Sequence, residues 1–352
     1  MNEVDFKSRD ETGATGGASQ GVRVVAPARL HLGLLDLAGD LGRRFGSIGL
    51  SVERPLLDLT VRHAGQFSVR GGDPERIARY VGLAADLLGV DPALKNEVAI
   101  VVDEAMPSHA GFGSGTQLAL SLAAALARIG GVRFDAARIA SGLDRGARSG
   151  IGLTAFLKGG FVVDGGRGAN SLVPPTIARL TFPRRWRVIL ILDHSIVGVH
   201  GPEEIEAFRA LPPLPSATAA WLCRLAMMKM LPALIEEDIA DFGGAVTEIQ
   251  ERLGDYFAPA QGGRRFVSPA VSEAMAVLRA AGSPGVGQSS WGPTGFALAA
   301  DEAEAKRLVN HVVMNCHTAS GLQFLITRGR NRGALITPAS SGDTGALASG
   351  AT

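Results

Sequence analysis

The stretch Pro107-Ser108-His109-Ala110-Gly111-Phe112-Gly113-Ser114-Gly115-Thr116-Gln117 lies between an apolar run at 98–102 and a segment rich in Leu and Ala at 118–129. This order predicts a strand, a glycine-rich loop and a helix. Glycine reaches positive φ at little cost and lets the backbone approach a ligand closely. The free N–H groups and the positive dipole end of the helix would then face the loop, which favours binding of an anion, most often phosphate.

A simpler interpretation is a strand-to-helix turn in which Ser114 or Thr116 caps the helix. Three glycines in five residues, with hydroxyl side chains on both sides, exceed what a cap needs. We therefore expect a phosphate-binding loop made by Gly111, Gly113, Ser114, Gly115, Thr116 and Gln117.

Length and composition set broad limits. A chain of 352 residues with 46% hydrophobic and 20% charged residues is typical of a globular protein with two domains. The net charge of +1 argues against a surface that binds nucleic acid or membranes by bulk charge. No apolar run is expected to reach the length of a membrane span, and Cys223 and Cys316 are spaced too widely for a metal-ligand pair. These features predict a cytoplasmic protein with reduced thiols.

Clusters of Gly, Pro and polar residues indicate the domain organisation. Residues 1–20 lack an apolar core and are expected to be a disordered leader rather than a signal peptide. An N-terminal domain over 21–183 and a C-terminal domain over 184–330 are predicted, followed by a disordered tail at 331–352. Helices and strands alternate around a glycine-rich turn at 282–295, which indicates a layered α+β second domain.

Local patterns predict individual elements. A strand at 22–26 should end at Pro27, and a hairpin should join 57–61 to 66–69. Paired strands are expected at 154–158 and 161–164. Helices are predicted at 74–89, 135–143, 218–231, 237–253, 269–281 and 302–315.

Polar residues in three further segments are candidate site residues. Arg29, His31 and Asp36 fall among apolar residues, where a buried cation is costly unless it is paired or faces a ligand. Taken alone, His31 is best interpreted as a hydrogen-bonded core histidine. The other candidates lie in two glycine-containing segments. Arg148, Ser149 and Gly150 lie in a Gly/Arg loop at 145–153, and the turn at 282–295 contains Gln288, Ser289, Ser290, Trp291 and Thr294.

Together, the loops resemble those of the GHMP small-molecule kinase superfamily. Its second motif, a Pro-x-x-x-Gly-Leu-Gly-Ser-Ser/Gly phosphate loop, is nearly complete here at Pro107, Gly111, Gly113, Ser114 and Gly115. The order and spacing of the other two motifs also fit, over roughly residues 22–328. The resemblance implies an α+β fold with a ribosomal-S5-like N-terminal domain and a ferredoxin-like C-terminal domain.

Two departures from the kinase pattern affect the chemistry. Many of these kinases have Ser-Gly-Ile-Asp after the phosphate loop, and this Asp takes the proton from the alcohol. Here the stretch is Ser149-Gly150-Ile151-Gly152, and glycine cannot act as a base. Homoserine kinases also lack this Asp, so the change weakens the kinase interpretation without excluding it. The third motif reads Gly287-Gln288-Ser289-Ser290-Trp291-Gly292-Pro293-Thr294 instead of the usual Gly-Ala-Gly-x-Gly-Gly.

Both departures, together with Arg29-Leu30-His31-Leu32-Gly33-Leu34-Leu35-Asp36, resemble one branch of the superfamily, the β-ribofuranosylaminobenzene 5′-phosphate synthases. This resemblance implies condensation of 4-aminobenzoate with phosphoribosyl pyrophosphate, with loss of carbon dioxide and pyrophosphate. The reaction belongs to methanopterin biosynthesis in one-carbon metabolism. The resemblance also implies a homodimer. We expect Mg²⁺ to be carried by the donor pyrophosphate, with no metal site built by the protein.

The resemblance assigns roles to the candidate residues. Arginine side chains would hold a carboxylate or phosphate, and an indole would stack on the arene, although Trp291 is explained equally well as a core aromatic. The expected catalytic residues are Arg29, His31, Arg148, Gln288 and Trp291. The expected substrate-binding residues are Asp36, Ser149, Gly150, Ser289, Ser290 and Thr294.

Three alternatives remain open at this point. The first is an ATP-dependent GHMP kinase that acts on a small-molecule alcohol. The second is a type I phosphoribosyltransferase, suggested by Asp103-Glu104 after an apolar run, but Pro107 and His109 occupy positions where that loop needs hydroxyls and N–H groups. The third is a non-enzymatic ligand-sensing protein, which is disfavoured because Arg, His and Ser are retained in the loops.

Overall fold

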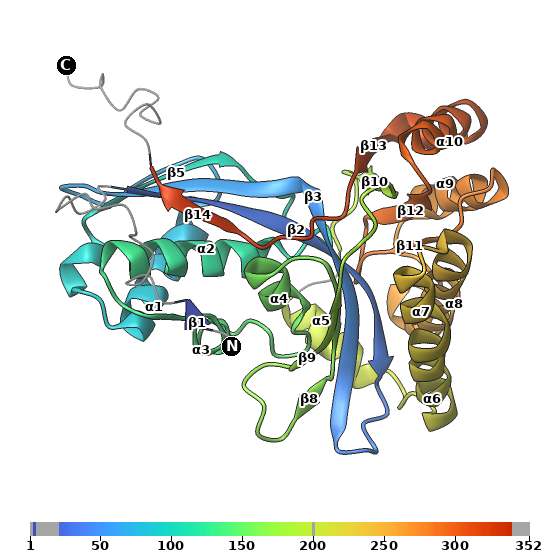
Figure 1. Ribbon diagram of the computed structural model, residues 1–352, viewed down its shortest axis with the longest axis horizontal. Helices are drawn as coiled ribbons and strands as arrows, with labels where there is room; N and C mark the ends of the chain where they lie inside the picture. Colours follow the sequence, from blue (N-terminus) through green and yellow to red (C-terminus); the bar gives the residue numbers. More distant parts are fainter. Residues whose placement is uncertain (1–2, 5–20, 199–200, 340–352) are drawn as a thin grey trace.

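The computed structural model describes residues 3–4, 21–198 and 201–339. Figure 1 shows two parts side by side, with the long strands β2 (Gly21–Asp36) and β3 (Arg43–His63) bending at their junction. One part is a large sheet covered by α1 to α4, and the other is a smaller sheet with α6 to α10 around it. This mixed α/β, two-part arrangement agrees with the predicted fold class.

The large sheet has the strand order β14-β2-β3-β5-β4, and β7 and β8 also pair with β3. Its neighbours are antiparallel except β4 and β5, which are parallel. The remaining strands are β4 (Ser68–Arg70), β5 (Val98–Glu104), β7 (Phe161–Asp164), β8 (Arg167–Gly168), β9 (Thr176–Leu180) and β14 (Leu335–Pro338).

Strand β2 continues nine residues beyond the end predicted from Pro27. Its register against β3 shifts between Pro27 and Ala28, and again between His31 and Gly33. A shift of this kind tolerates a residue that has no N–H to donate and bends the strand. The second half of β2 therefore reaches the junction of the two parts and carries Arg29 and His31 there.

The predicted hairpin between 57–61 and 66–69 is wrong. Strand β4 pairs in parallel with β5, and β5 lies between β4 and β3 in the sheet. Parallel neighbours need a crossover connection, which is supplied by α1 (Pro74–Leu88) and the 3₁₀ turn η2 (Pro92–Lys95). Helix α1 is capped by Asp73 and ends at the left-handed Gly89, as its sequence indicates.

Three more helices cover the large sheet: α2 (Ser114–Ile129), α3 (Ala136–Gly142) and α4 (Ile151–Leu157). Residues 117–127 of α2 are all buried, which its run of Ala and Leu permits. The segment 154–158, predicted as a strand, lies mostly in α4. Short apolar runs do not distinguish a buried strand from a buried helix.

The second part contains an antiparallel sheet with the order β11-β12-β10-β13. Its strands are β10 (Arg187–Asp193), β11 (Val286–Gln288), β12 (Gly295–Ala299) and β13 (Leu322–Thr327). Its helical elements are α5 (Gly201–Ala210), α6 (Ser216–Leu225), the π-helical η3 (Ala226–Met230), α7 (Leu231–Ile235), α8 (Ile239–Phe257), η4 (Ala258–Gln261), α9 (Pro269–Ala280), α10 (Glu302–Asn315) and η5 (Ala319–Gly321). The predicted helices of this part are confirmed.

One continuous run, Ser216–Ile235, is long and apolar enough to span a membrane, with a mean hydropathy of 1.3. The expectation that no run reaches this length is therefore wrong. Leu222 and Met230 of this run are fully buried in the core, and Arg224 and Lys229 interrupt it. A core helix of a globular protein has these same properties.

Both ends of the described chain form strands, which corrects two expectations. Within the predicted leader, β1 (Glu3–Val4) pairs with β6 (Phe134–Asp135). Within the predicted tail, β14 pairs with β2 through the registers Leu335 to Val25 and Pro338 to Val22. Residues 5–20 and 340–352 lie outside the described part. The chain passes from the large sheet to the small one between β9 and β10.

Candidate active site

Three distant segments meet at the carbonyl oxygen of Gly111. The Arg29 guanidinium donates a hydrogen bond to this oxygen at 2.6 Å, and the Ser289 hydroxyl donates another at 2.7 Å. The Arg29 N–H also donates to the Phe112 carbonyl at 3.0 Å. The predicted phosphate loop, residues 111–117, which keeps the name phosphate loop below, is thereby joined both to β2 and to the turn between β11 and β12.

Two loop glycines are required by their conformation and close packing. Gly111 and Gly113 have φ of +84° and +74°. A Cβ atom at Gly113 would lie 3.0 Å from Arg29 Nε, and one at Gly111 would lie 2.4 Å from the Ser289 carbonyl oxygen. Helix α2 begins directly after Gly113 without any side-chain cap. The interpretation of Ser114 or Thr116 as a cap is therefore wrong, and the first N–H groups of α2 remain available to a ligand.

Two adjoining cavities surround this loop. The first, here called the aromatic chamber, has a volume of about 320 Å³ and is lined by Phe257, Phe266 and Trp291 together with Leu34 and Leu253. The second, here called the loop chamber, has a volume of about 470 Å³ and is lined by the phosphate loop and the start of α1. Both are lined by Arg29, Thr116, Arg145, Gly201, Ser290 and Trp291, so they form one continuous site.

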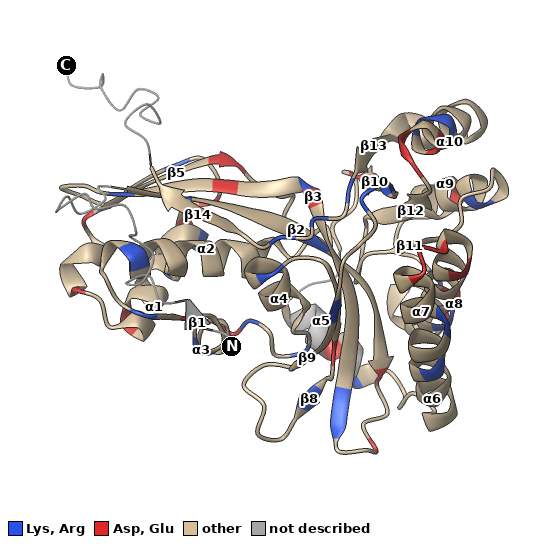
Figure 2. Ribbon diagram, in the orientation of Figure 1, with Lys and Arg blue, Asp and Glu red and all other residues tan. Residues whose placement is uncertain are grey.

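Arginine dominates the charge of this site. The described residues of the two linings include Arg29, Arg76, Arg79, Arg145, Arg148 and Arg265, and among these described residues the acids are Asp73 and Asp144. One of these acids, Asp73, accepts the Arg76 N–H at 3.1 Å as the cap of α1. Charged residues of both signs occur in both parts of the molecule (Figure 2), so the excess of positive charge is local. Such a site suits a strongly anionic ligand.

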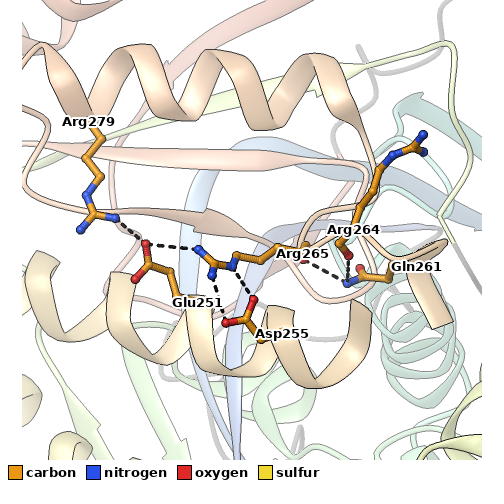
Figure 3. A network of polar contacts seen from close by, with 6 residues as sticks. All are labelled: Glu251, Asp255, Gln261, Arg264, Arg265 and Arg279. Carbon is orange, nitrogen blue, oxygen red and sulfur yellow. Dashed lines mark hydrogen bonds and ion pairs between the residues drawn. The ribbon is translucent and has the colours of Figure 1, made fainter. Parts of the chain in front are cut away.

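One of these arginines is already neutralised. Arg265 binds Asp255 through two hydrogen bonds of 2.7 and 3.0 Å and lies 3.6 Å from Glu251, which also pairs with Arg279 (Figure 3). The Gln261 amide donates to the backbone carbonyl of Arg265 at 3.0 Å and accepts from the Gln288 amide at 3.1 Å. This network holds the chain after α8 at the wall of the aromatic chamber.

His31 is held neutral in the wall of the aromatic chamber. Burial, with a smaller contribution from the charge of Arg29, lowers the pKa of His31 to about 3. The His31 N–H donates to Ser289 Oγ at 3.0 Å, and its carbonyl accepts from the Ser290 N–H at 3.1 Å. Its imidazole has no hydrogen-bond partner among the described residues. The interpretation of His31 as a hydrogen-bonded core histidine is therefore wrong: the residue is buried, but it lines the aromatic chamber and its ring makes no described hydrogen bond.

Gly152 is a packing position in helix α4. A Cβ atom there would lie 3.0 Å from Thr116 Cγ2, and the Gly152 carbonyl accepts from the Gln117 amide at 2.8 Å. The preceding turn is fixed by the buried Asp164, which accepts N–H bonds from Ser47, Gly150 and Gly166 at 2.8–3.0 Å. Burial raises the pKa of the Asp164 carboxyl. A side chain at position 152 would therefore meet the Thr116 side chain in the first turn of α2.

Twelve of the predicted site residues line the two chambers. Eleven of them are Arg29, His31, Gly111, Gly113, Ser114, Gly115, Thr116, Arg148, Ser149, Ser290 and Trp291. The twelfth, Gln288, lines the aromatic chamber, but its side chain is occupied by Val267, Gln261 and Ser290.

Five predicted residues lie outside both linings. Asp36 accepts the N–H groups of Ala38 and Gly39 at the end of β2. Ser289 and Gly150 make the internal contacts given above, and Gln117 and Thr294 are buried. These residues stabilise the loops of the site through contacts within the protein and do not line the cavities.

Sequence reasoning missed several residues that line the candidate site. Arg76 and Arg79 are three residues apart and so share one face of α1, a signal that could have been noticed. Gln250, whose amide donates to the Leu32 carbonyl and whose oxygen accepts the Gln288 N–H, gives no sequence signal.

Within the described residues, no three His, Cys, Asp or Glu side chains are grouped as a metal site would need.

Comparison with known proteins agrees with this architecture. The GHMP kinases N terminal domain matches residues 76–160, and the GHMP kinases C terminal family matches residues 230–316. The chain is 32% identical to the β-ribofuranosylphenol 5′-phosphate synthase of Methanothermobacter thermautotrophicus, over 89% of this chain and 98% of the relative. The namesake from Archaeoglobus fulgidus is 31% identical, over 90% and 99%. The chain belongs to the β-ribofuranosylphenol 5′-phosphate synthase family of GHMP proteins.

Solved structures place this synthase family member in the same fold. Homoserine kinase from Cytophaga hutchinsonii superimposes with a TM-score of 0.67 at 16% identity, over 92% of this chain and 99% of that one. Mevalonate diphosphate decarboxylase from Staphylococcus aureus gives 0.61 at 14% identity, over 90% and 98%. At this identity the likeness concerns the fold alone.

Proposed function

We propose that the chain is a decarboxylating C-ribosyltransferase. It transfers the phosphoribosyl group of phosphoribosyl pyrophosphate to the ring carbon of 4-aminobenzoate that bears the carboxylate, as a step of methanopterin biosynthesis. The observation that carries this proposal is an arginine-lined double chamber on a phosphate loop, with glycine at the position of the kinase base. The relatives' name supports it.

The reaction balances without an added acid or base. The bond between ribose C1 and the pyrophosphate oxygen breaks, and its electron pair leaves with pyrophosphate. The arene carbon that bears the carboxylate donates a π-electron pair to C1. The bond to the carboxylate then breaks, its electron pair restores aromaticity, and carbon dioxide leaves. The protein therefore needs to position two substrates, stabilise charge and exclude water.

The proposed roles follow from the chamber linings. The Phe257 and Trp291 rings, with centroids 4.7 Å apart, offer an apolar wall for the arene. Arg29 and Arg148 would hold carboxylate or phosphate oxygens. A neutral His31 can bind ribose hydroxyls without placing another positive charge beside C1. Magnesium would arrive on the donor phosphates, and no step is assigned to it.

The identity of the arene is part of the proposal. The relatives' names specify a phenol product, whereas the sequence resemblance pointed to an aminobenzene. Both para substituents donate electrons to the ring carbon that attacks. The proposal places the reaction in the cytoplasm and expects a homodimer, which light scattering can test.

A direct assay tests the reaction. The full chain is incubated with phosphoribosyl pyrophosphate, Mg²⁺ and carboxyl-labelled 4-aminobenzoate or 4-hydroxybenzoate. Equal release of labelled carbon dioxide and pyrophosphate is expected with at least one arene, and none without the donor.

The second candidate is an ATP-dependent GHMP kinase, favoured only by the fold and the phosphate loop. The same preparation is therefore tested with ATP and a panel of alcohols. ATP-dependent phosphorylation of an alcohol, together with no carbon dioxide from either arene, would overturn the transferase proposal.

A further inference from the structure

Three arginine side chains surround one tyrosine ring beside the loop chamber. The guanidinium carbons of Arg76, Arg79 and Arg145 lie 5.8, 5.4 and 5.6 Å from the centroid of the Tyr80 ring. Among the described residues, neither Arg76 nor Arg79 has an ion pair or a side-chain hydrogen bond. Three neighbouring cations repel one another, and one ring offsets only part of that repulsion. No carboxylate of the described residues forms an ion pair with any of these three guanidinium groups.

The cluster lies directly against the phosphate loop. A Cβ atom at Gly115 would come within 2.4 Å of Arg76 Nη2 and 3.6 Å of Arg145 Cζ. Arg145 donates to the Tyr80 hydroxyl, and its buried Nε has no hydrogen-bond partner within the part of the chain that the structure describes. Tyr80 is only 1% exposed, so it forms a fixed platform under the three guanidinium groups. These groups and the uncapped N–H groups of α2 line the same space.

From this arrangement we infer that the pyrophosphate group of the donor binds in the loop chamber, held by Arg76, Arg79 and Arg145 together with the phosphate loop. The inference rests on the proposed function and assigns one end of the donor to one chamber. A pyrophosphate carries more charge and more acceptor oxygens than the 5′-phosphate. The pyrophosphate group therefore matches the three guanidinium groups of this cluster better than the 5′-phosphate does.

The stereochemistry of the reaction supports the same assignment. Phosphoribosyl pyrophosphate is an α-anomer, and the name shared by the relatives specifies a β-ribofuranosyl product. The arene must then attack the face of C1 opposite the pyrophosphate. With the arene against Phe257 and Trp291 in the aromatic chamber, the pyrophosphate points away from it, toward the loop chamber.

The exposure of the cluster also suits a leaving group. Arg79 is exposed and Arg76 is half-buried, so the loop chamber opens to solvent at the start of α1. Pyrophosphate can depart by this route without crossing the aromatic chamber. The C-ribosyl product would leave separately.

Binding measurements with inorganic pyrophosphate and Mg²⁺ test the assignment without turnover. Isothermal titration is run on Arg76→Gln, Arg79→Gln and the double variant, with Arg138→Gln as a matched control on the exposed face of α3, outside both chambers. Each single change should weaken pyrophosphate binding roughly tenfold and the double change roughly a hundredfold, because each removes a charge-assisted contact. Binding of ribose 5-phosphate should stay within about twofold, and Arg138→Gln should match the wild type.

Two outcomes would overturn the inference. One is unchanged pyrophosphate affinity in the double variant. The other is an equal loss of ribose 5-phosphate affinity, which would place the 5′-phosphate at this cluster. A chain that binds pyrophosphate through Arg76 and Arg79 but releases no carbon dioxide would contradict the proposed function and leave this site intact.

Discussion

Single residues set the protonation state of the site, and His31 is the clearest case. The native protein keeps this imidazole neutral down to about pH 3, whereas the unfolded chain takes up its proton near pH 6.5. Between these values the unfolded state binds the additional proton. The free energy of unfolding should therefore fall as the pH drops from 6.5 toward 3, by up to about 1.4 kcal/mol per pH unit.

Urea denaturation at several pH values in this window measures that contribution. His31→Gln should lose this part of the slope, while His311→Gln, at an exposed position of α10, should keep it. An identical slope in the wild type and His31→Gln would show that His31 is not the responsible group.

A second prediction at the residue scale concerns Gly152. Restoring the kinase-like residue with Gly152→Asp should not create a kinase, because the new side chain would collide with Thr116. We expect a stability loss of about 1–3 kcal/mol, as for other overpacked positions. The thermal unfolding midpoint and ATP turnover are measured.

The double variant Gly152→Ala with Thr116→Ser is the control for this prediction. It removes the methyl group that lies 3.0 Å from the new Cβ and should recover most of the loss caused by Gly152→Ala alone. If Gly152→Asp is as stable as the wild type, the packing argument is incorrect.

At the scale of elements, the turn between β11 and β12 acts through one buried hydroxyl. Ser289→Ala would remove the acceptor of the His31 N–H and one donor to Gly111. Leaving a buried N–H without a partner costs about 1–3 kcal/mol. Because both partners belong to the site, donor KM should rise together with the loss of stability.

Ser283→Ala is the matched control. The Ser283 hydroxyl is buried and donates to Gly285 and Leu298, outside both chambers. It should cost similar stability and leave donor KM unchanged. Steady-state kinetics measure donor KM, and chemical denaturation measures the stability of both variants. Equal donor KM values for Ser289→Ala and Ser283→Ala would show that Ser289 has no role in the site.

Elements with a strong local signal were predictable from sequence. The glycine spacing predicted the loop between β5 and α2, and the helix predicted at 74–89 corresponds to α1. Features set by distant contacts were not predictable. The parallel pairing of β4, the continuation of β2 past Pro27 and the role of Asp164 depend on partners far along the chain. For the same reason, the arginines of α1 could not be assigned to the phosphate loop from sequence alone.

At the scale of the whole molecule, the C-terminal strand secures the first sheet. Truncation after Gly333 would remove β14 and expose the edge of β2. The thermal midpoint should fall by several degrees, because backbone pairing along four residues of β2 is lost. Truncation after Ala339 keeps every described contact and should retain the wild-type midpoint. Equal midpoints for the two truncations would show that β14 adds no stability.

The pairing of β14 with β2 also defines how the second part is attached. The large sheet contains strands that precede the second part in the sequence and one strand, β14, that follows it. The segment 187–327 is therefore an insertion within one domain. Its entry and exit are neighbours, since Val188 pairs with Thr327. Closely spaced ends are the condition under which a domain can be inserted into another. Residues 187–327 could thus be exchanged as one unit between related proteins. Such an exchange would replace the aromatic wall of the site, while the phosphate loop and the three arginines around Tyr80 would stay unchanged.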